Sequence, residues 1–236
     1  MTKHNSQERL GQYRTVGGKP FYVAEVVSGG RDEQSEQGLR ACANGIADVL
    51  DYSWETKFVV PGVLSHADLA VAGLTGEQVK ERITAGSRRY LVAVAGINPV
   101  TSPDDILAFT AFEDYQPRRP IRANPLLRKY PNIRDLESRD GMMTTESTVP
   151  RLALLHHVVE QANPKHKVSA YAEEASPASV RFYEEYGFTR DDSIPPAALT
   201  ETFGQSRLTY VHMEAAAAGP VQELVLNGLF RYIDDV

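Results

Sequence analysis

The most informative segment of the chain is Ser176-Pro-Ala-Ser-Val-Arg-Phe-Tyr-Glu-Glu-Tyr-Gly-Phe188. Its composition predicts a short amphipathic helix followed at once by a strand. Ser176 at the N-cap, Pro177 at the first helical position and Gly187 just past the end are typical start and stop signals of such a helix. Tyr183 and the phenylalanine before it form an aromatic pair in the middle of this helix.

Strands and helices are predicted on both sides of this segment from the period of the apolar residues, which is two in strands and close to 3.6 in helices. The first strand, residues 20–27, is rich in aromatic and β-branched residues. The other predicted strands are 90–95, 106–115, 133–138, 167–172, the one that begins at 188, and 207–213, and the predicted helices span 39–50, 76–85, 149–161, 176–187 and 221–233.

Two long connections and two ends complete this organisation. Residues 52–74 and 116–132 are predicted to be irregular, and the first of these is unusually apolar for a surface loop, so it must fold back onto the core. We expect residues 1–19 to form a loosely held lead-in, 20–214 a single domain and 215–236 a C-terminal helical extension.

The spacing of Ser176, Ser179, Tyr183 and the pair Gly187-Phe188 resembles the last helix of the GCN5-related N-acetyltransferase (GNAT) superfamily, N-x-x-A/S-x-x-x-Y-x-x-x-G-F. The predicted order β-α-α-β-β-β-α-β-α-β-β is also similar to the succession of elements in that superfamily. The resemblance implies an α/β (α+β) fold with a central mixed, mostly antiparallel sheet flanked by helices, plus the additional C-terminal helix. It also implies acetyl-CoA, or another acyl-CoA, as co-substrate.

Composition restricts the function classes. The net charge of −6 argues against a surface that binds nucleic acid throughout, and a single cysteine excludes an intrachain disulfide or a Cys-rich zinc site. No apolar run reaches the ~18 residues of a membrane span, and the first residues lack the apolar core of a signal peptide. We therefore expect a cytoplasmic protein without a membrane partner.

Acyl transfer from a thioester to an amine needs a deprotonated nucleophile, a polarised carbonyl and a proton for the departing sulfur. In the GNAT superfamily the tyrosine of the last helix supplies that proton, and this role is implied here for Tyr183; a residue that only packs on the sheet is the alternative. The candidates for the general base are Glu137 and Glu113, then Asp114 and Asp135, and more weakly Glu173 and Glu174; each could equally be an ordinary solvated or ion-paired carboxylate.

The loop that binds the CoA pyrophosphate in the superfamily, Q/R-x-x-G-x-G/A, is not matched by residues 138–151, where Gly141 is the only glycine. A substitute is a helix that begins near Pro150, capped by Ser147 or Thr148, whose N–H groups face a phosphate. The alternative is a capped loop without a ligand. The residues predicted to hold the cofactor are Leu136, Ser138, Arg139, Gly141, Thr144, Thr145, Ser147, Thr148, Arg151, Ser176 and Ser179.

Three other features are interpreted as structural and not as functional sites. His157 and Glu160 share one face of the predicted helix that also contains His156, so a metal pair is conceivable; since no third ligand and no H-E-x-x-H motif is evident, we expect a solvent-facing pair and no metal. Cys42 lies on an apolar helix face and is expected to be buried and inert. The basic stretch Arg118–Lys129 is interpreted as a solvated loop, with an anionic substrate, the CoA 3′-phosphate or RNA as alternatives.

The leading functional prediction is an acyl-CoA-dependent N-acetyltransferase acting on an amine-bearing small molecule or peptide. Two alternatives stay open: a catalytically inactive acyl-CoA-sensing or protein-interaction module with the same fold, and an acetyltransferase directed at aminoacyl-tRNA. The apolar C-terminal helix could also mediate a homodimer.

Overall fold

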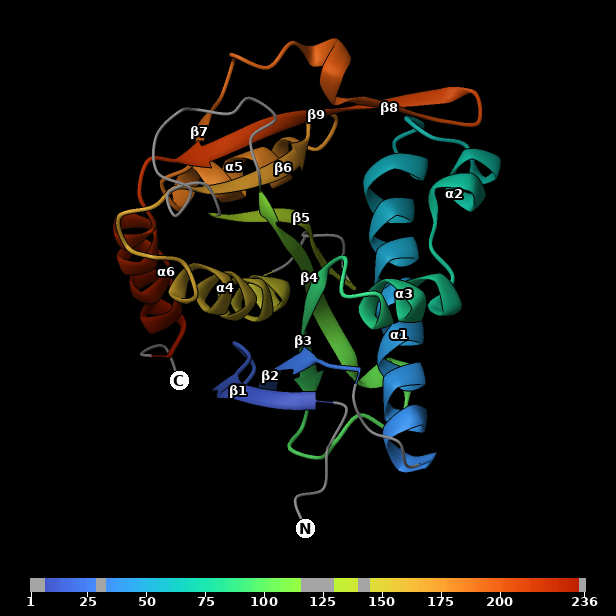
Figure 1. The fold of residues 1–236 in the computed structure, drawn as a ribbon, viewed down its shortest axis with the longest axis vertical. Coiled ribbons are helices and arrows are strands. Elements are labelled where there is room, and N and C mark those ends of the chain that lie inside the picture. The colour runs from blue at the N-terminus through green and yellow to red at the C-terminus, as the bar shows by residue number, and fades with distance from the viewer. Residues whose placement is uncertain (1–6, 29–32, 116–129, 140–144, 234–236) are drawn as a thin grey trace.

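A single twisted sheet runs through the centre of the computed structural model, which describes residues 7–28, 33–115, 130–139 and 145–233 (Figure 1). The sheet has nine strands in the order β1-β2-β3-β4-β5-β6-β9-β7, and β8 pairs with β9 beside this path. The strands are β1 (Gln7–Arg14), β2 (Pro20–Val26), β3 (Arg89–Ala95), β4 (Ile106–Tyr115), β5 (Tyr130–Ser138), β6 (Val168–Glu173), β7 (Thr189–Arg190), β8 (Thr200–Phe203) and β9 (Ser206–Ala215).

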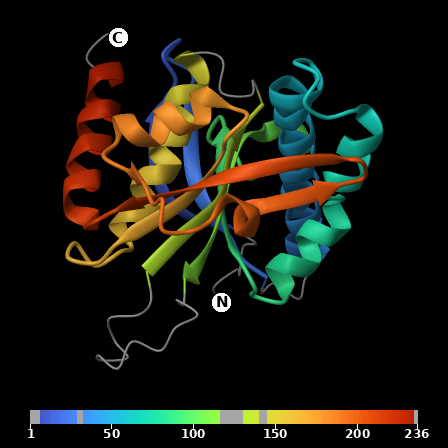
Figure 2. The ribbon, with the colours of Figure 1, turned by 90° about the horizontal axis from the view of Figure 1, so that it is seen from above.

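Helices cover both faces of the sheet, as the view from above shows (Figure 2). One face carries α4 (Thr145–Glu160), α5 (Pro177–Glu185) and α6 (Ala218–Ile233), and the other carries α1 (Glu33–Trp54), α2 (His66–Ala72) and α3 (Gly76–Thr84). In the part of the chain that the structure describes, no helix combines the length and apolarity needed to cross a membrane.

Local sequence explains where several helices begin and end. Thr75 and Gln78 form a reciprocal capping box at the start of α3, and Ser65 and Asp68 form another at the start of α2. Gly187 adopts a φ of +86° directly after α5, a conformation that glycine tolerates without a steric penalty.

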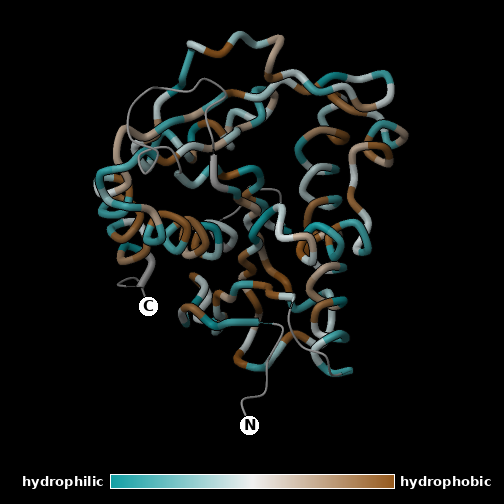
Figure 3. The backbone as a smooth tube through the Cα atoms, viewed as in Figure 1, coloured by the Kyte–Doolittle hydropathy of each residue, from teal (hydrophilic) through white to brown (hydrophobic). Residues whose placement is uncertain are grey.

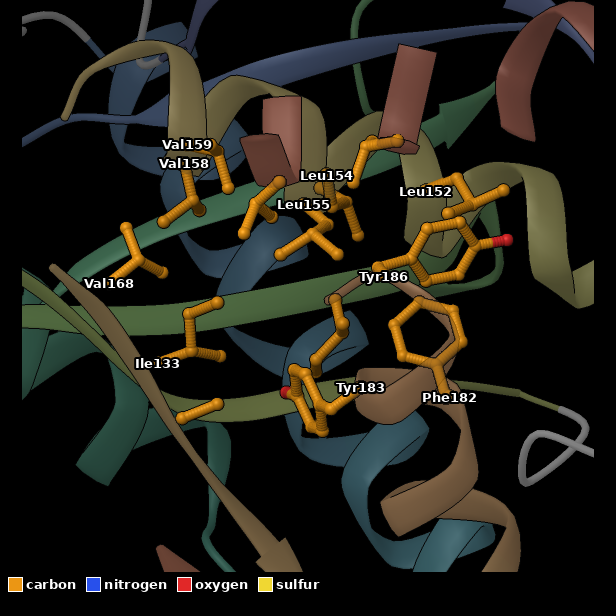
Figure 4. Close-up of a cluster of buried hydrophobic side chains, with 14 of the residues drawn as sticks. Ile133, Leu152, Leu154, Leu155, Val158, Val159, Val168, Phe182, Tyr183 and Tyr186 are labelled. Carbon is orange, nitrogen blue, oxygen red and sulfur yellow. The ribbon is translucent and has the colours of Figure 1, made fainter. Parts of the chain in front are cut away.

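Two hydrophobic cores lie on opposite faces of the sheet, because successive strand residues point to opposite sides. Figure 3 shows hydrophobic residues concentrated on the central strands and the neighbouring helices. One core joins α4, α5 and α6 to the sheet, and Figure 4 shows the leucines and valines of α4 in it together with Tyr183. The other joins α1 and α3 to the sheet and includes Trp54 and Phe58.

The sheet opens between β5 and β6. These two strands are the parallel pair, and their ladder contains only the pairs Asn132↔Ser169 and Ile133↔Ala170. Beyond these pairs β5 continues to Ser138 and β6 to Glu173 without further pairing to each other, so the two strands diverge. We call this part of the sheet, where β5 and β6 no longer pair with each other, the opening between β5 and β6.

The predicted mixed, mostly antiparallel sheet and its flanking helices are confirmed. The loose lead-in is wrong for residues 7–14, because β1 pairs with β2 from Gln7↔Val26 to Arg14↔Pro20. As an edge strand β1 is held by backbone hydrogen bonds and lacks the apolar run that marks a buried strand.

The irregular connection predicted for residues 52–74 is also wrong. It contains the end of α1, the π-helix η1 (Glu55–Val59) and α2. Trp54 and Phe58 do fold back onto the core as predicted, whereas Val60 is 77% exposed. Two strand predictions were imperfect as well: β5 begins at Tyr130, and the strand β8 was missed.

The start of α4 differs from the prediction too. The helix begins at Thr145, so Pro150 lies inside it and Ser147 and Thr148 are first-turn residues, not N-caps. A proline has no N–H to donate, which removes one backbone hydrogen bond within this helix.

Candidate active site

A buried cluster of charged side chains lies where β5 and β6 diverge. Lys57 Nζ is 2.6 and 2.8 Å from the two carboxylate oxygens of Glu137 and 3.6 Å from Glu173. Ser53 donates a 2.6 Å hydrogen bond to the same Glu137 carboxylate. The side chains of Lys57, Glu137 and Glu173 are at most 10% exposed, so one cation and two carboxyl groups share a space nearly closed to water.

Three elements bring this cluster together. Glu137 lies near the end of β5 and Glu173 is the last residue of β6, on the two strands that separate. Lys57 is the central residue of the π-helix η1, which continues α1 directly. Because a π-helix has more residues per turn than an α-helix, it changes the direction of the side chains that follow, and such turns are frequent at functional sites.

The two carboxyl groups are coupled to each other and to Lys57. Burial raises the pKa of Glu137 to about 7, and Lys57 opposes this rise. Burial also favours the neutral form of Glu173, but Lys57 and the Ser179 hydroxyl outweigh it and hold the pKa of Glu173 below its usual value. The two carboxyl groups therefore titrate as a pair, and near neutral pH they can accept and release a proton.

Tyr183 approaches the same cluster from the opposite face of the sheet. It is 2% exposed and packs between the rings of Phe182 and Phe188, with centroid distances of 5.6 and 5.3 Å. Figure 4 shows the hydroxyls of Tyr183 and Tyr186 pointing in opposite directions. Burial, together with Glu173 and Glu137, raises the pKa of Tyr183 well above 10, so this phenol keeps its proton at neutral pH.

The second turn of α4 and the start of α5 lie on the Tyr183 side of the sheet. Arg151 of α4 is 3% exposed, and its guanidinium carbon lies 4.6 Å from the centre of the Phe182 ring. The Ser179 hydroxyl donates a 3.0 Å hydrogen bond to the hydroxyl oxygen of Ser176. Ser176 is the N-cap residue of α5, but its side chain accepts no hydrogen bond from a backbone N–H of that helix. Through Phe182, Arg151 thus contacts α5, the helix that begins after Ser176 and carries Ser179.

The remaining predicted cofactor residues are less uniform in placement. Leu136, Ser138 and Ser147 are buried, and Thr148 is half-buried. Arg139 donates to the backbone carbonyl oxygens of Ile106 and Pro103, both at 2.7 Å, so its guanidinium is engaged on the side of β4. Gly141 and Thr144, the side chain of Thr145, and the basic stretch Arg118–Lys129 lie outside the described residues.

A pocket of about 480 Å³ opens on the α1 face of the sheet, next to the charged cluster. Asp135 in its wall precedes Glu137 by two residues and shares its strand face, and Tyr171 stands in the same relation to Glu173. Tyr210, directly opposite Glu173 on β9, also lines the pocket. The lining consists of Leu50, Trp54, Ala72, Leu74, Arg82, Arg88, Arg134, Asp135, Tyr171, Ala198, Leu199, Glu201, Phe203 and Tyr210.

The candidates for the general base lie in different environments in the structure. Glu137 belongs to the buried cluster, whereas Glu113 is 34% exposed and lies at the pocket side, 3.9 Å from Arg88 and 3.6 Å from Arg134. Asp135 lines the pocket and Glu174 is exposed, while the side chain of Asp114 lies outside the described residues.

Sequence reasoning missed Lys57 and Ser53 and gave little weight to Glu173. Lys57 falls in a segment predicted to be irregular, and a lysine in such a segment is ordinarily solvated. The apolar neighbours of Lys57, Trp54 and Phe58, were the available signal, since they indicated that this segment returns to the core.

Two side-chain expectations away from the cluster can be compared with the structure. Cys42 is buried as predicted, and burial raises the pKa of its thiol to about 12. The solvent-facing histidine pair is wrong: His157 is 7% exposed, with Nε2 2.8 Å from the Tyr13 hydroxyl. The reason is β1, which lies beside α4 and covers this side of the helix; the ligand atoms of His156, His157 and Glu160 lie within 4.8 Å of one another.

Comparisons with known proteins concern the fold. No protein-family model matches the chain, and no curated protein matches it in sequence. A solved structure provisionally described as an acetyltransferase has a TM-score of 0.51 and 12% identity, covering 97% of this chain and 100% of that chain.

The chain is also similar to two further solved structures, one of them with a TM-score above 0.5. An uncharacterised protein from Bacillus halodurans has a TM-score of 0.51 and 10% identity, covering 96% of this chain and 98% of that chain. A protein from Bordetella pertussis, provisionally described as a GnaT-family acetyltransferase, has a TM-score of 0.39 and 14% identity, covering 73% of this chain and 93% of that chain. At such identities the similarity describes the arrangement of the backbone and nothing finer.

Proposed function

We propose that this chain, whose fold is that of the GCN5-related N-acetyltransferase superfamily, transfers an acyl group from acyl-CoA, most simply acetyl-CoA, to a primary amine. One observation carries the proposal: Lys57, Glu137 and Glu173 form a buried cluster where β5 and β6 diverge, and the charges of Glu137 and Glu173 act on the buried Tyr183 and raise its pKa. A proton acceptor and a proton donor thus share one water-poor site, as acyl transfer requires.

The carboxyl pair and Tyr183 have separate roles in the proposed reaction. The amine nitrogen attacks the thioester carbonyl carbon, a C–N bond forms, and the C–S bond then breaks. The ionised carboxyl of the Glu137–Glu173 pair takes the proton that the nitrogen loses. Tyr183 gives its proton to the departing sulfur and regains one from the carboxyl pair, so the products are an amide and the CoA thiol.

The acyl donor is proposed to enter from the α4 and α5 side. On the edge of β5 that faces away from β4, residues 134–138 have no pairing with β6, and this edge is proposed to bind the amide groups of an extended pantetheine arm. Arg151 of α4 and Ser176 and Ser179 at the start of α5 are proposed to contact the donor from this side. The amine is proposed to enter from the pocket on the other face, since Asp135 and Tyr171 lead from that pocket to the cluster.

One observation favours a second candidate, an acyl-CoA-binding module without catalysis. The helix α4 begins at Thr145 and carries Pro150 in its second turn, in place of the glycine-rich start that binds pyrophosphate in the superfamily. A module of this kind would bind acyl-CoA and release it without transfer to any amine.

Calorimetric titration with acetyl-CoA, CoA and longer acyl-CoAs tests the proposal first. We expect saturable binding, and thiol release when an accepted amine is added to the acetyl-CoA complex. Binding without thiol release across a broad set of amines would support the non-catalytic module. No binding of any acyl-CoA at millimolar concentration contradicts both.

A further inference from the structure

Three arginines occupy one wall of the pocket on the α1 face. Arg88 and Arg134 are 23% and 29% exposed at their side chains, and Arg82 of α3 lies beside them. Burial raises the pKa of the neighbouring Asp135, and the positive charges of Arg88, Arg134 and Arg82 oppose this rise.

The ion pairs of these arginines are long. Arg88 is 3.7 Å from Asp135 and 3.9 Å from Glu113, and Arg134 is 3.6 Å from Glu113. All three separations exceed the 2.7–3.2 Å of an N–H···O hydrogen bond. The adjacent residue Arg89 shows the difference, because it binds both oxygens of Glu25 at 2.7 and 2.8 Å.

Arg134 also has an aromatic neighbour in the pocket. Its guanidinium carbon lies 4.7 Å from the centre of the Tyr171 ring, a cation–π contact. A guanidinium offers five donors in a fork that matches the oxygens of a carboxylate or a phosphate. Arg88 and Arg134 are partly exposed and have no carboxylate partner at hydrogen-bond distance among the described residues, so both can bind an anion.

The rest of the pocket limits the kind of molecule. Trp54, Phe203 and Tyr210 provide aromatic surface, and the volume of about 480 Å³ fits a small molecule. Asp135, beside the arginines, precedes Glu137 by two strand residues, a spacing of roughly 7 Å along β5. A ligand with an anionic group at the arginines and an amine at Glu137 would have these groups several bonds apart.

Resting on the proposed function, we infer that this pocket selects small primary amines that also carry a carboxylate or a phosphate, which Arg88 and Arg134 bind. The arginine pair supplies the recognition and the aromatic surface holds the body of the acceptor. Glu113 weakens this binding, because it competes with the ligand for the same two guanidinium groups.

Calorimetry with matched ligand pairs tests this inference without requiring catalysis. The pairs are 6-aminohexanoate with hexylamine, and phosphoethanolamine with ethanolamine, each titrated into the wild-type protein saturated with CoA. We expect at least one anionic member to bind about tenfold or more tightly than its partner, as a charge-assisted hydrogen-bonded contact would give. Equal affinities within both pairs overturn the inference, and the pair that shows the preference identifies the anion.

Variants test which residues cause the preference for the anionic ligand. Arg88→Gln and Arg134→Gln should each abolish most of this preference, and Glu113→Gln should increase the affinity for the anionic ligand a few-fold. Arg89→Gln is the matched control and should leave the preference intact. A preference that survives in both Arg88→Gln and Arg134→Gln contradicts the assignment. If Arg88→Gln or Arg134→Gln does not fold, Glu113→Gln still tests the assignment. Tighter binding of the anionic ligand in Glu113→Gln supports it, and unchanged or weaker binding contradicts it.

The two proposals fail separately. Preferential binding of anionic amines without acyl transfer to them overturns the proposed function and leaves the anion site standing. Transfer to amines at rates indifferent to the anionic group overturns the selectivity and leaves the acyltransferase standing.

Discussion

Lys57 is the residue on which the proposed site depends most, because it neutralises two carboxyl groups in a nearly water-free place. Glu137 and Glu173 outweigh the effect of burial and raise the pKa of Lys57, so the ammonium form persists. A buried ion pair of this kind contributes little net stability compared with apolar residues, but losing one partner is costly. We interpret the retention of these charges as a sign of chemistry at this site.

Replacing the cation tests this interpretation. Lys57→Met should lower the free energy of unfolding by about 3–5 kcal/mol, because two buried carboxyl groups then lack their counter-ion. The double variant Lys57→Met, Glu137→Leu should regain a large part of that loss. Urea unfolding measures both values, and a cost below roughly 1 kcal/mol for the single variant would show that the cluster is hydrated.

The pH dependence of turnover tests the carboxyl pair. A base must lose its own proton before it can accept one, and burial raises the pKa of Glu137 to about 7. We therefore expect kcat to rise with pH up to about 7 and to level off above it. In Glu137→Gln this limb should vanish and kcat should fall by roughly 10²–10⁴.

The exposed neighbour of the pair supplies the control. Glu174→Gln should retain both the limb near 7 and the rate of the wild type. If kcat of Glu137→Gln still rises with pH and levels off near 7, the titrating group is not Glu137 but another one, such as the acceptor amine.

Among the elements, α2 and the β8–β9 hairpin hold the outer side of the pocket together. Asp68 of α2 accepts hydrogen bonds from the Gln205 backbone N–H at 2.8 Å and from the Ser206 hydroxyl at 2.7 Å. The hairpin turn approaches closely, since a Cβ at Gly204, where φ is +57°, would lie 2.2 Å from an Asp68 oxygen. These contacts connect residues more than 130 positions apart in the sequence.

Asp68→Asn should loosen this contact. The Ser206 hydroxyl, the Gln205 N–H and the Ser65 hydroxyl hold the pKa of Asp68 well below its usual value. The carboxylate thus stabilises the fold fully above the unfolded pKa of about 3.9, and this contribution is lost as pH falls toward the folded pKa.

We expect Asp68→Asn to lower Tm at pH 7 by roughly 2–4 °C, and by less at pH 3. The exposed Asp192→Asn serves as the matched control. Thermal unfolding at the two pH values measures the effect, and an unchanged Tm at pH 7 would mean that the hairpin is held by other contacts.

At the scale of the whole molecule, α6 is part of the core and not an appendage. Val221, Val225 and Leu229 of this helix are buried in the same cluster as α4, and only Leu224 and Phe230 among its described large apolar side chains are more than one-third exposed. The apolar face that suggested a homodimer is therefore largely used within the chain, and a dimer stays a prediction.

Truncating α6 side chains checks this arrangement. Leu229→Ala should lower the free energy of unfolding by about 2–5 kcal/mol, because it removes a buried side chain. Leu224→Ala, in the same helix but 41% exposed, should cost less than about 1 kcal/mol. Similar losses in urea unfolding would contradict the packing of α6 on α4.

The sequence predicted most of this molecule because the buried strands and helices carry strong local signals. Residues 90–95 read as a strand and Thr75 as a helix cap, and both are confirmed. The edge strand β1 and the π-helix around Lys57 escaped because long-range pairing and burial stabilise them, and neither leaves a local pattern. For the same reason Glu137 and Tyr183 could be nominated singly, while their meeting with Lys57 required the folded chain.

The central claim is that Tyr183 donates a proton to the departing thiolate, and the rate of thiol release from bound acetyl-CoA in Tyr183→Phe tests it most directly. Tyr186→Phe, which removes a neighbouring buried phenol, is the control. We predict that Tyr183→Phe slows release by roughly 10²–10⁴ while its affinity for acetyl-CoA stays close to that of the wild type and of Tyr186→Phe. Thiol release at the wild-type rate in Tyr183→Phe would contradict the account.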